Sequence, residues 1–252
     1  LVSAGLDQTC RLWAEVPVPD SDSGGDEGKE AEGVTWHEVG RPQVHGFDTT
    51  AACCIPQHRL VSGADEKVVR VFEAPKATIR LLDSLDRSGE PKQGIANPPQ
   101  YGADRPERGY LPSLGLSNRA TAAEEVEEVV DGFPNDETSS PEKEILQLPT
   151  ERDLGVTSLW PETRKLFGHH YEIVCLASAA TENGEMMVAS ACKARDVENA
   201  AIRIFDIQTG ECLQVLKGGH KSTVATLSFS SDTNYLISAG KDRRLCLWRR
   251  GV

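Results

Sequence analysis

The sequence predicts an all-β fold assembled from repeated units of four strands, and three observations favour it. The segment LVSAGLDQTCRLW opens the chain and returns near its end as LISAGKDRRLCLW. Apolar and polar residues alternate in stretches such as TVATLSF, which is the period of a β-strand with one buried face. Glycine and proline are frequent, at 22 and 14 of 252 residues. This composition favours many turns over long helices.

The repeated unit contains a serine, an acidic residue and an aromatic residue at fixed spacing. Four serines mark the copies: Ser3, Ser62, Ser190 and Ser238. All except Ser190 are followed by an acidic residue after four positions and by Trp or Phe after ten. The Ser190 copy has five extra residues where the others have a tight turn. Three copies are preceded, 17 to 21 residues earlier, by a histidine: His45, His169 and His220. Such a period indicates stacked supersecondary units.

The most complete copy combines GGH at 218–220, LSFSSD at 227–232, LISAGKD at 236–242 and LCLW at 245–248. These stretches resemble the WD-repeat family of β-propellers. The resemblance implies four-stranded blades around a channel, and a buried hydrogen-bond network within each blade. Because Phe72 and Phe205 lack an indole N–H, the network is incomplete in two blades. The expected network residues are His220, Ser238, Asp242, Trp248, His169, Ser190, His45, Ser62, Ser3, Asp7 and Trp13.

His220, Ser238 and Asp242 also make a Ser/His/Asp set, so a hydrolase triad is the alternative interpretation. Two observations oppose it. The set recurs in partial form with His169 and Ser190, and a nucleophile has no reason to repeat on several strands. Ser238 also lies in an alternating strand rather than in a G-x-S-x-G turn. We therefore predict no catalytic residues and a protein that is not an enzyme.

No metal or cofactor site is predicted. His169 and His170 are adjacent, and adjacent residues on a strand point to opposite faces, so they do not share one ion. The same argument applies to Cys53 and Cys54. Phosphate-binding glycine motifs are absent from the sequence, as are apolar runs long enough to span a membrane. The net charge of −12 points away from direct tRNA or DNA binding.

Further segments narrow the resemblance to the WD-repeat subunits of the Elongator complex. They are RLVSGADEKVVRVFEAPK at 59–76, GYLPSLGLSNRA at 109–120, SLWPETRKLFGHHYEI at 158–173, ASACKA at 189–194 and TWHEVGRPQVHGFD at 35–48. The resemblance implies a non-catalytic scaffold that supports modification of the tRNA wobble uridine at position 5, in the cytoplasm and also the nucleus. Its implied partners are the other Elongator subunits, chiefly the large propeller-bearing scaffold subunit. The alternative is a WD-repeat adaptor that binds peptides in signalling or ubiquitin transfer.

The same resemblance implies parts of two tandem seven-bladed propellers joined by a long insertion. Proline-rich sequence followed by TAAEEVEEVVDG interrupts the repeats for too long to be an ordinary blade loop. We expect the last blades of the first propeller at 1–86, the insertion at 87–152 and the first blades of the second propeller at 153–252.

Within these parts we expect an acidic loop at 20–33, a strand at 110–118 and a short helix at 121–131. The acidic loop lacks large apolar residues and is expected to be solvated. Docking of a basic partner is the alternative for this loop. The helix is expected to pack on the edge of the propeller, with docking of a partner as the alternative.

Overall fold

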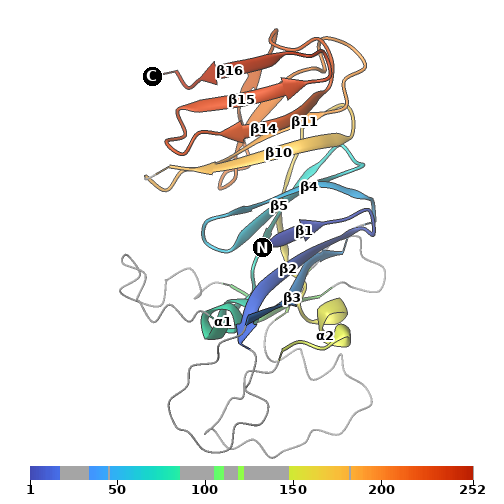
Figure 1. The fold of residues 1–252 in the computed structure, drawn as a ribbon, viewed down its shortest axis with the longest axis vertical. Coiled ribbons are helices and arrows are strands. Elements are labelled where there is room, and N and C mark those ends of the chain that lie inside the picture. The colour runs from blue at the N-terminus through green and yellow to red at the C-terminus, as the bar shows by residue number, and fades with distance from the viewer. Residues whose placement is uncertain are drawn as a thin grey trace, which may run out of the picture.

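A computed structural model describes residues 1–17, 34–44, 46–85, 105–110, 119–121, 148–181 and 183–251 (Figure 1). Within these ranges the chain forms sixteen strands and two helices. The all-β class predicted from the alternating pattern is therefore confirmed. Strand β10 (Ile173–Ala180) shows the alternation directly, with every second residue buried. All seven residues of β11 (Met186–Cys192) are buried, because this strand lies between two others and both of its faces are covered.

Fourteen of the sixteen strands form four antiparallel sheets, which we call blades 1 to 4. Blade 1 consists of β1 (Val2–Ala4), β2 (Thr9–Pro17) and β3 (Val34–Val44). Blade 2 consists of β4 (Thr49–Ile55), β5 (Arg59–Ala64), β6 (Val69–Glu73) and β9 (Glu162–Leu166). Blade 3 consists of β10, β11, β12 (Ile202–Asp206) and β13 (Cys212–Leu216). Blade 4 consists of β14 (Val224–Phe229), β15 (Tyr235–Gly240) and β16 (Leu245–Arg249).

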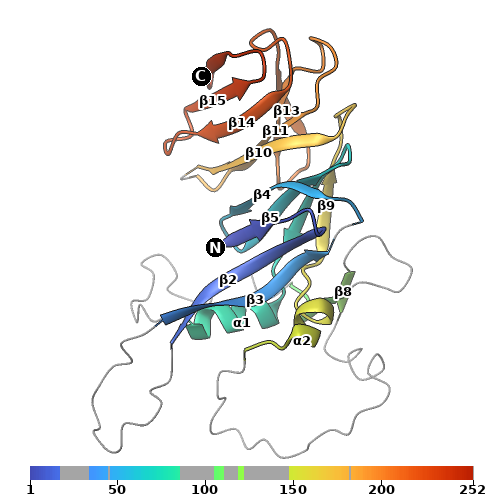
Figure 2. The same cartoon turned by 45° about the vertical axis from the view of Figure 1, so that its right-hand side comes forward.

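The blades stack face to face in chain order, as Figures 1 and 2 both show. Three apolar clusters fill the spaces between them. Leu12 and Val39 of blade 1 meet Leu60 and Phe72 of blade 2. The second cluster joins blades 2 and 3, and the third joins blades 3 and 4. Blades 2 and 3 thus bury apolar side chains on both faces, and blades 1 and 4 each bury them against one neighbour. Repeat units of this kind gain stability from such contacts between neighbours.

A long segment leaves blade 2 after β6 and returns to it at β9. It contains α1 (Lys76–Leu85), the two-stranded sheet of β7 (Arg108–Tyr110) and β8 (Arg119–Thr121), and α2 (Glu151–Val156). Both helices lie beside blade 1, α1 against β2 and α2 against β3 (Figure 2). Strand β9 lies in the range 153–252, where the first blades of the second propeller are expected. It pairs with β6, which lies in the range 1–86 expected for the first propeller. The division into two propellers stays a prediction.

Two expected elements fall mainly outside the described residues. Of the expected strand at 110–118, only Tyr110 is described, and it ends β7. Of the expected helix at 121–131, only Thr121 is described, and it ends β8. The expected acidic loop at 20–33 lies outside the described residues altogether.

Candidate functional site

In blade 4 the four expected network residues lie within hydrogen-bonding distance in one chain. Trp248 Nε1 donates to Ser238 Oγ at 2.8 Å. Ser238 Oγ lies 2.8 Å from His220 Nε2, and His220 Nδ1 lies 3.1 Å from Asp242 Oδ1. The second carboxylate oxygen of Asp242 accepts the backbone N–H of Lys221 at 2.7 Å. This chain of bonds ties together strands β15 and β16, the turn between them, and the segment before β14.

The partners in blade 4 determine which atom carries each proton. The Lys221 backbone N–H, helped by His220, lowers the pKa of Asp242 to about 2, against a smaller opposing effect of burial. Asp242 is therefore a carboxylate, which only accepts, so His220 carries its proton on Nδ1. Ser238 then accepts from Trp248, and with a neutral imidazole it donates to His220 Nε2. Ser238 and His220 are each 1% exposed, so the hydroxyl is shielded from solvent.

Two glycines make room for this arrangement. A Cβ at Gly219 would lie 2.5 Å from Cζ2 of Trp248, and a Cβ at Gly240 would lie 2.5 Å from Nδ1 of His220. Both distances are shorter than a real Cβ contact, so larger residues would displace the indole or the imidazole. Gly219 of the GGH stretch therefore lets the indole ring of Trp248 pack against the turn.

Blade 3 contains a shorter version of the network. His169 Nε2 lies 2.8 Å from Ser190 Oγ, and the ring centroid of Phe205 lies 6.3 Å from that of His169. Burial lowers the pKa of His169 to about 3, with smaller contributions from the positive charge of Arg203 and from His170. His169 is therefore neutral at physiological pH. The cavity beside it has a volume of about 10 Å³, which admits no more than one water molecule.

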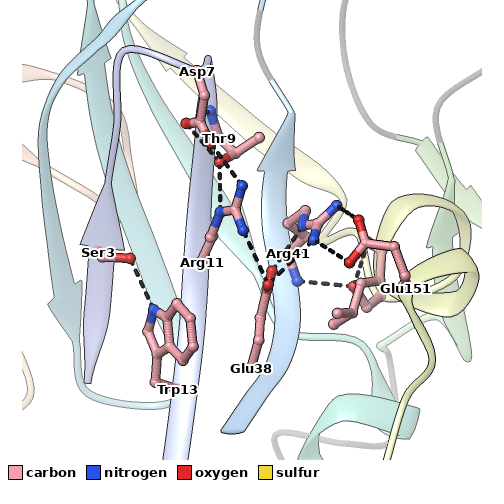
Figure 3. A network of polar contacts seen from close by, with 10 residues as sticks. Ser3, Asp7, Thr9, Arg11, Trp13, Glu38, Arg41 and Glu151 are labelled. Atoms are coloured by element: carbon pink, nitrogen blue, oxygen red, sulfur yellow. Dashed lines mark hydrogen bonds and ion pairs between the residues drawn. The ribbon is translucent and has the colours of Figure 1, made fainter.

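Blades 1 and 2 depart further from the expected network. In blade 1, Trp13 Nε1 donates to Ser3 Oγ at 2.8 Å, as in blade 4 (Figure 3). Asp7 accepts from Thr9 and Arg11 instead of meeting a histidine. In blade 2, Ser62 is 1% exposed and its hydroxyl has no partner among the described residues. Its expected partner His45 lies outside the described residues.

Figure 3 also shows a network of charges that the sequence did not indicate. Arg41 on β3 donates from Nε to Glu38 Oε1 at 2.7 Å and from Nη1 and Nη2 to Glu151 of α2 at 2.9 and 3.0 Å. Arg11 on β2 donates to the other oxygen of Glu38 at 3.2 Å. The backbone N–H of Arg41 donates to Ser158 Oγ at 2.8 Å. These bonds fasten α2 and the residues after it to blade 1.

The charges in this network stabilise one another. Glu38 and Glu151 raise the pKa of Arg41 above its ordinary value. Arg41 in turn lowers the pKa of Glu151. Both shifts keep the two side chains ionised across the physiological range.

The described part of the chain contains no cluster of three or more potential metal ligands. None of its helices is long and apolar enough to cross a membrane. All seven cysteines are free thiols. Burial raises the pKa of Cys10 and Cys175 to about 12 and that of Cys53 to about 11. Thiols with such pKa values are poor nucleophiles at neutral pH.

Comparison with known proteins agrees with the fold. The family model "WD domain, G-beta repeat" matches residues 210–249, which contain β13 to β16. Elongator complex protein 2 of Mus musculus is 35% identical over 258 residues, which cover 99% of this chain and 29% of that protein. The Schizosaccharomyces pombe protein of the same name is 38% identical over 98% of this chain and 29% of its own length. That of Saccharomyces cerevisiae is 34% identical over 100% of this chain and 30% of its own length.

The chain thus spans less than a third of the curated relatives that it matches. The resemblance predicted from the non-repeat segments is confirmed by these comparisons. Residues 210–249 thus match the WD-repeat model, and the chain is similar along nearly its whole length to a segment of Elongator complex protein 2.

Proposed function

We propose that this chain is part of a non-catalytic scaffold subunit of an Elongator complex. The observation that carries the proposal is the similarity to proteins named Elongator complex protein 2 over 98% to 100% of the chain. Through contacts between proteins, the subunit supports modification of the tRNA wobble uridine at position 5. Its partners are the other Elongator subunits, chiefly the large propeller-bearing scaffold subunit. Direct contact with tRNA is minor, and the protein acts in the cytoplasm and also the nucleus.

The geometry of blade 4 supports a structural role for the Ser/His/Asp set. A serine nucleophile needs a hydroxyl that a substrate can reach, with a base free to take its proton. Ser238 is buried and already accepts the indole N–H of Trp248. Repetition supports the same role, since Ser190 and His169 form a second buried pair one blade away. Such fully bonded buried networks hold strands in one register.

The stacked blades support a scaffold because their broad edges stay in fixed relative positions. Apolar clusters join each blade to the next, and the bonds of Arg41 hold α2 on blade 1. Partner proteins can therefore bind at several positions without competing for one pocket. The two tandem propellers belong to the same proposal, and a structure of the longer protein tests that part.

Affinity purification tests the proposed function. The full-length protein carries a small tag and is isolated from its own cells at physiological salt, and an unrelated WD-repeat protein with the same tag is the control. We expect the other Elongator subunits in amounts close to equal with the tagged protein. Their absence, with recovery of ubiquitin-transfer or signalling proteins instead, would overturn the scaffold proposal and favour a peptide-binding adaptor.

A further inference from the structure

A cleft of about 340 Å³ lies between blades 2 and 3. Arg59, Glu73 and Arg164 line it from blade 2, and Gln208 lines it from the turn between β12 and β13 of blade 3. Val71 and Ile207 form its apolar walls. None of these residues belongs to the networks described above.

Strand pairing brings the charged residues to one face of blade 2. Val71 is buried against blade 3, and Arg164 on β9 is its direct cross-strand partner. Glu73 follows Val71 by two positions and is paired with Arg59 on β5. Residues two apart on a strand, and residues directly opposite in a pair, share a face of the sheet. The two arginines and the glutamate therefore all point towards blade 3.

Neighbouring groups hold both guanidinium groups in place. Arg164 Nη1 donates to the backbone oxygen of Thr209 at 2.8 Å. A Cβ at Gly210 would lie 2.7 Å from Cδ of Arg164, so the glycine leaves space for the arginine stem. Arg59 donates from Nε to Glu73 Oε1 at 2.6 Å, and its Nη1 lies 3.3 Å from the sulfur of Met186. Arg164 is thus anchored to blade 3 through Thr209. Arg59 is held by Glu73 on its own blade and by Met186 of blade 3.

Donors remain on both arginines after these bonds. A guanidinium has five N–H donors, and the bonds of Arg164 and Arg59 to described residues use only one or two of them. The cleft also holds two positive charges against the single carboxylate of Glu73. Val71 and Ile207 are 1% and 3% exposed, so the wall beside these charges is apolar. Arg164 is itself exposed, so its remaining donors can be reached from solvent.

From this geometry we propose that the cleft binds one oxyanion carried by a partner polypeptide. The oxyanion is the carboxylate of an Asp or Glu side chain or a phosphoryl group, since both match the fork of an arginine. A volume of about 340 Å³ is at the lower end for ligand sites, so it receives one side chain. The free donors of Arg164 and Arg59 bind the oxygens. This inference adds a defined contact point to the proposed scaffold and does not depend on which complex the scaffold serves.

Ligand-observed NMR with the full-length protein tests the proposal. The probes are N-acetylglutamic acid N-methylamide, its neutral glutamine analogue, and inorganic phosphate. We expect saturable line broadening of the glutamic probe or of phosphate and none of the glutamine analogue. The responding probe identifies the source of the oxyanion. If neither anion broadens more than the neutral analogue, the proposal is wrong.

Three variants assign the binding to the cleft. Arg164→Gln should weaken binding by at least about tenfold, the effect of losing one charge-assisted hydrogen bond. Glu73→Gln should strengthen it severalfold, because Arg59 then loses its competing carboxylate. Lys241→Gln removes one positive charge at an exposed turn of blade 4 and should leave binding unchanged. Equal effects of Arg164→Gln and Lys241→Gln would show that binding reflects net charge. No gain with Glu73→Gln would show that Arg59 does not bind the anion, and either result would overturn the site.

Discussion

Arg41 on β3 and Glu151 on α2 form a two-pronged ion pair, with Nη1 2.9 Å from Oε1 and Nη2 3.0 Å from Oε2. The two residues are 110 positions apart in the sequence. Trp160, which follows α2, is 2% exposed and donates its backbone N–H to the oxygen of Pro42 on β3. The pair therefore marks where the chain returns to the blades before β9 begins.

The first prediction concerns this anchor. Arg41→Met should lower the free energy of unfolding by about 1–3 kcal/mol, because Glu38 loses a charged hydrogen-bond partner at a mostly buried position. Urea denaturation followed by tryptophan fluorescence measures the change. As a control, Arg250→Met removes an exposed pair with Glu185 and should cost less than about 1 kcal/mol. Equal losses in the two variants would contradict an anchoring role for Arg41.

The second prediction concerns pH. His169 has a pKa of about 3 in the folded protein, below its ordinary value of 6.5. As the pH falls, the imidazole of His169 is protonated in the unfolded chain before it is protonated in the folded protein. The free energy of unfolding therefore decreases from about pH 6.5 down towards pH 3. His169→Gln should flatten this slope by up to about 1.4 kcal/mol per pH unit, the value for one proton. Urea denaturation at several pH values within this window measures the slope.

The control for this pH experiment is His37→Gln, at an exposed position on β3. It should leave the slope as it is in the original protein. A slope that is the same in all three proteins would show that His169 does not supply the proton uptake.

The third prediction concerns the outer face of blade 4. Ile237, Leu245 and Leu247 are exposed there, and Ile237 and Leu247 are direct cross-strand partners. A contiguous apolar sheet face with a free edge strand promotes association. The 252-residue chain should therefore self-associate in size-exclusion chromatography with light scattering, and Leu247→Lys should shift it towards monomer. Val197→Lys, in a loop of blade 3, is the control. A monomeric original chain would contradict this prediction.

Some of the site follows from the sequence because its geometry is local. In blade 4, Ser238 is the cross-strand partner of Cys246, so Trp248 lies two residues beyond and on the same face. A spacing of ten residues with a tight turn therefore brings serine and indole together. The same spacing in blade 1 joins Ser3 to Trp13. Period and turn length are together sufficient to predict both contacts.

Other contacts could not be predicted because they join distant segments. Nothing in the sequence around Arg41 or Glu151 distinguishes them from other surface charges. The pairing of β6 with β9 is equally long-range, since β6 ends at Glu73 and β9 begins only at Glu162. Local periodicity indicates that a strand forms, but it does not indicate which strand becomes its neighbour. The cleft at Arg59 and Arg164 depends on that pairing, so the sequence does not predict it either.

Denaturation of Ser238→Ala tests the central claim that the Ser/His/Asp set stabilises the blade. Removing the hydroxyl leaves His220 Nε2 and Trp248 Nε1 without partners, and the free energy of unfolding should fall by about 1–3 kcal/mol. Ser231→Ala, at an exposed position in the turn before β15, should change it by less than about 0.5 kcal/mol. Trp248→Phe combined with Ser238→Ala should cost less than the sum of the two single changes, because both remove one shared bond. Equal stability of Ser238→Ala and Ser231→Ala would contradict the account.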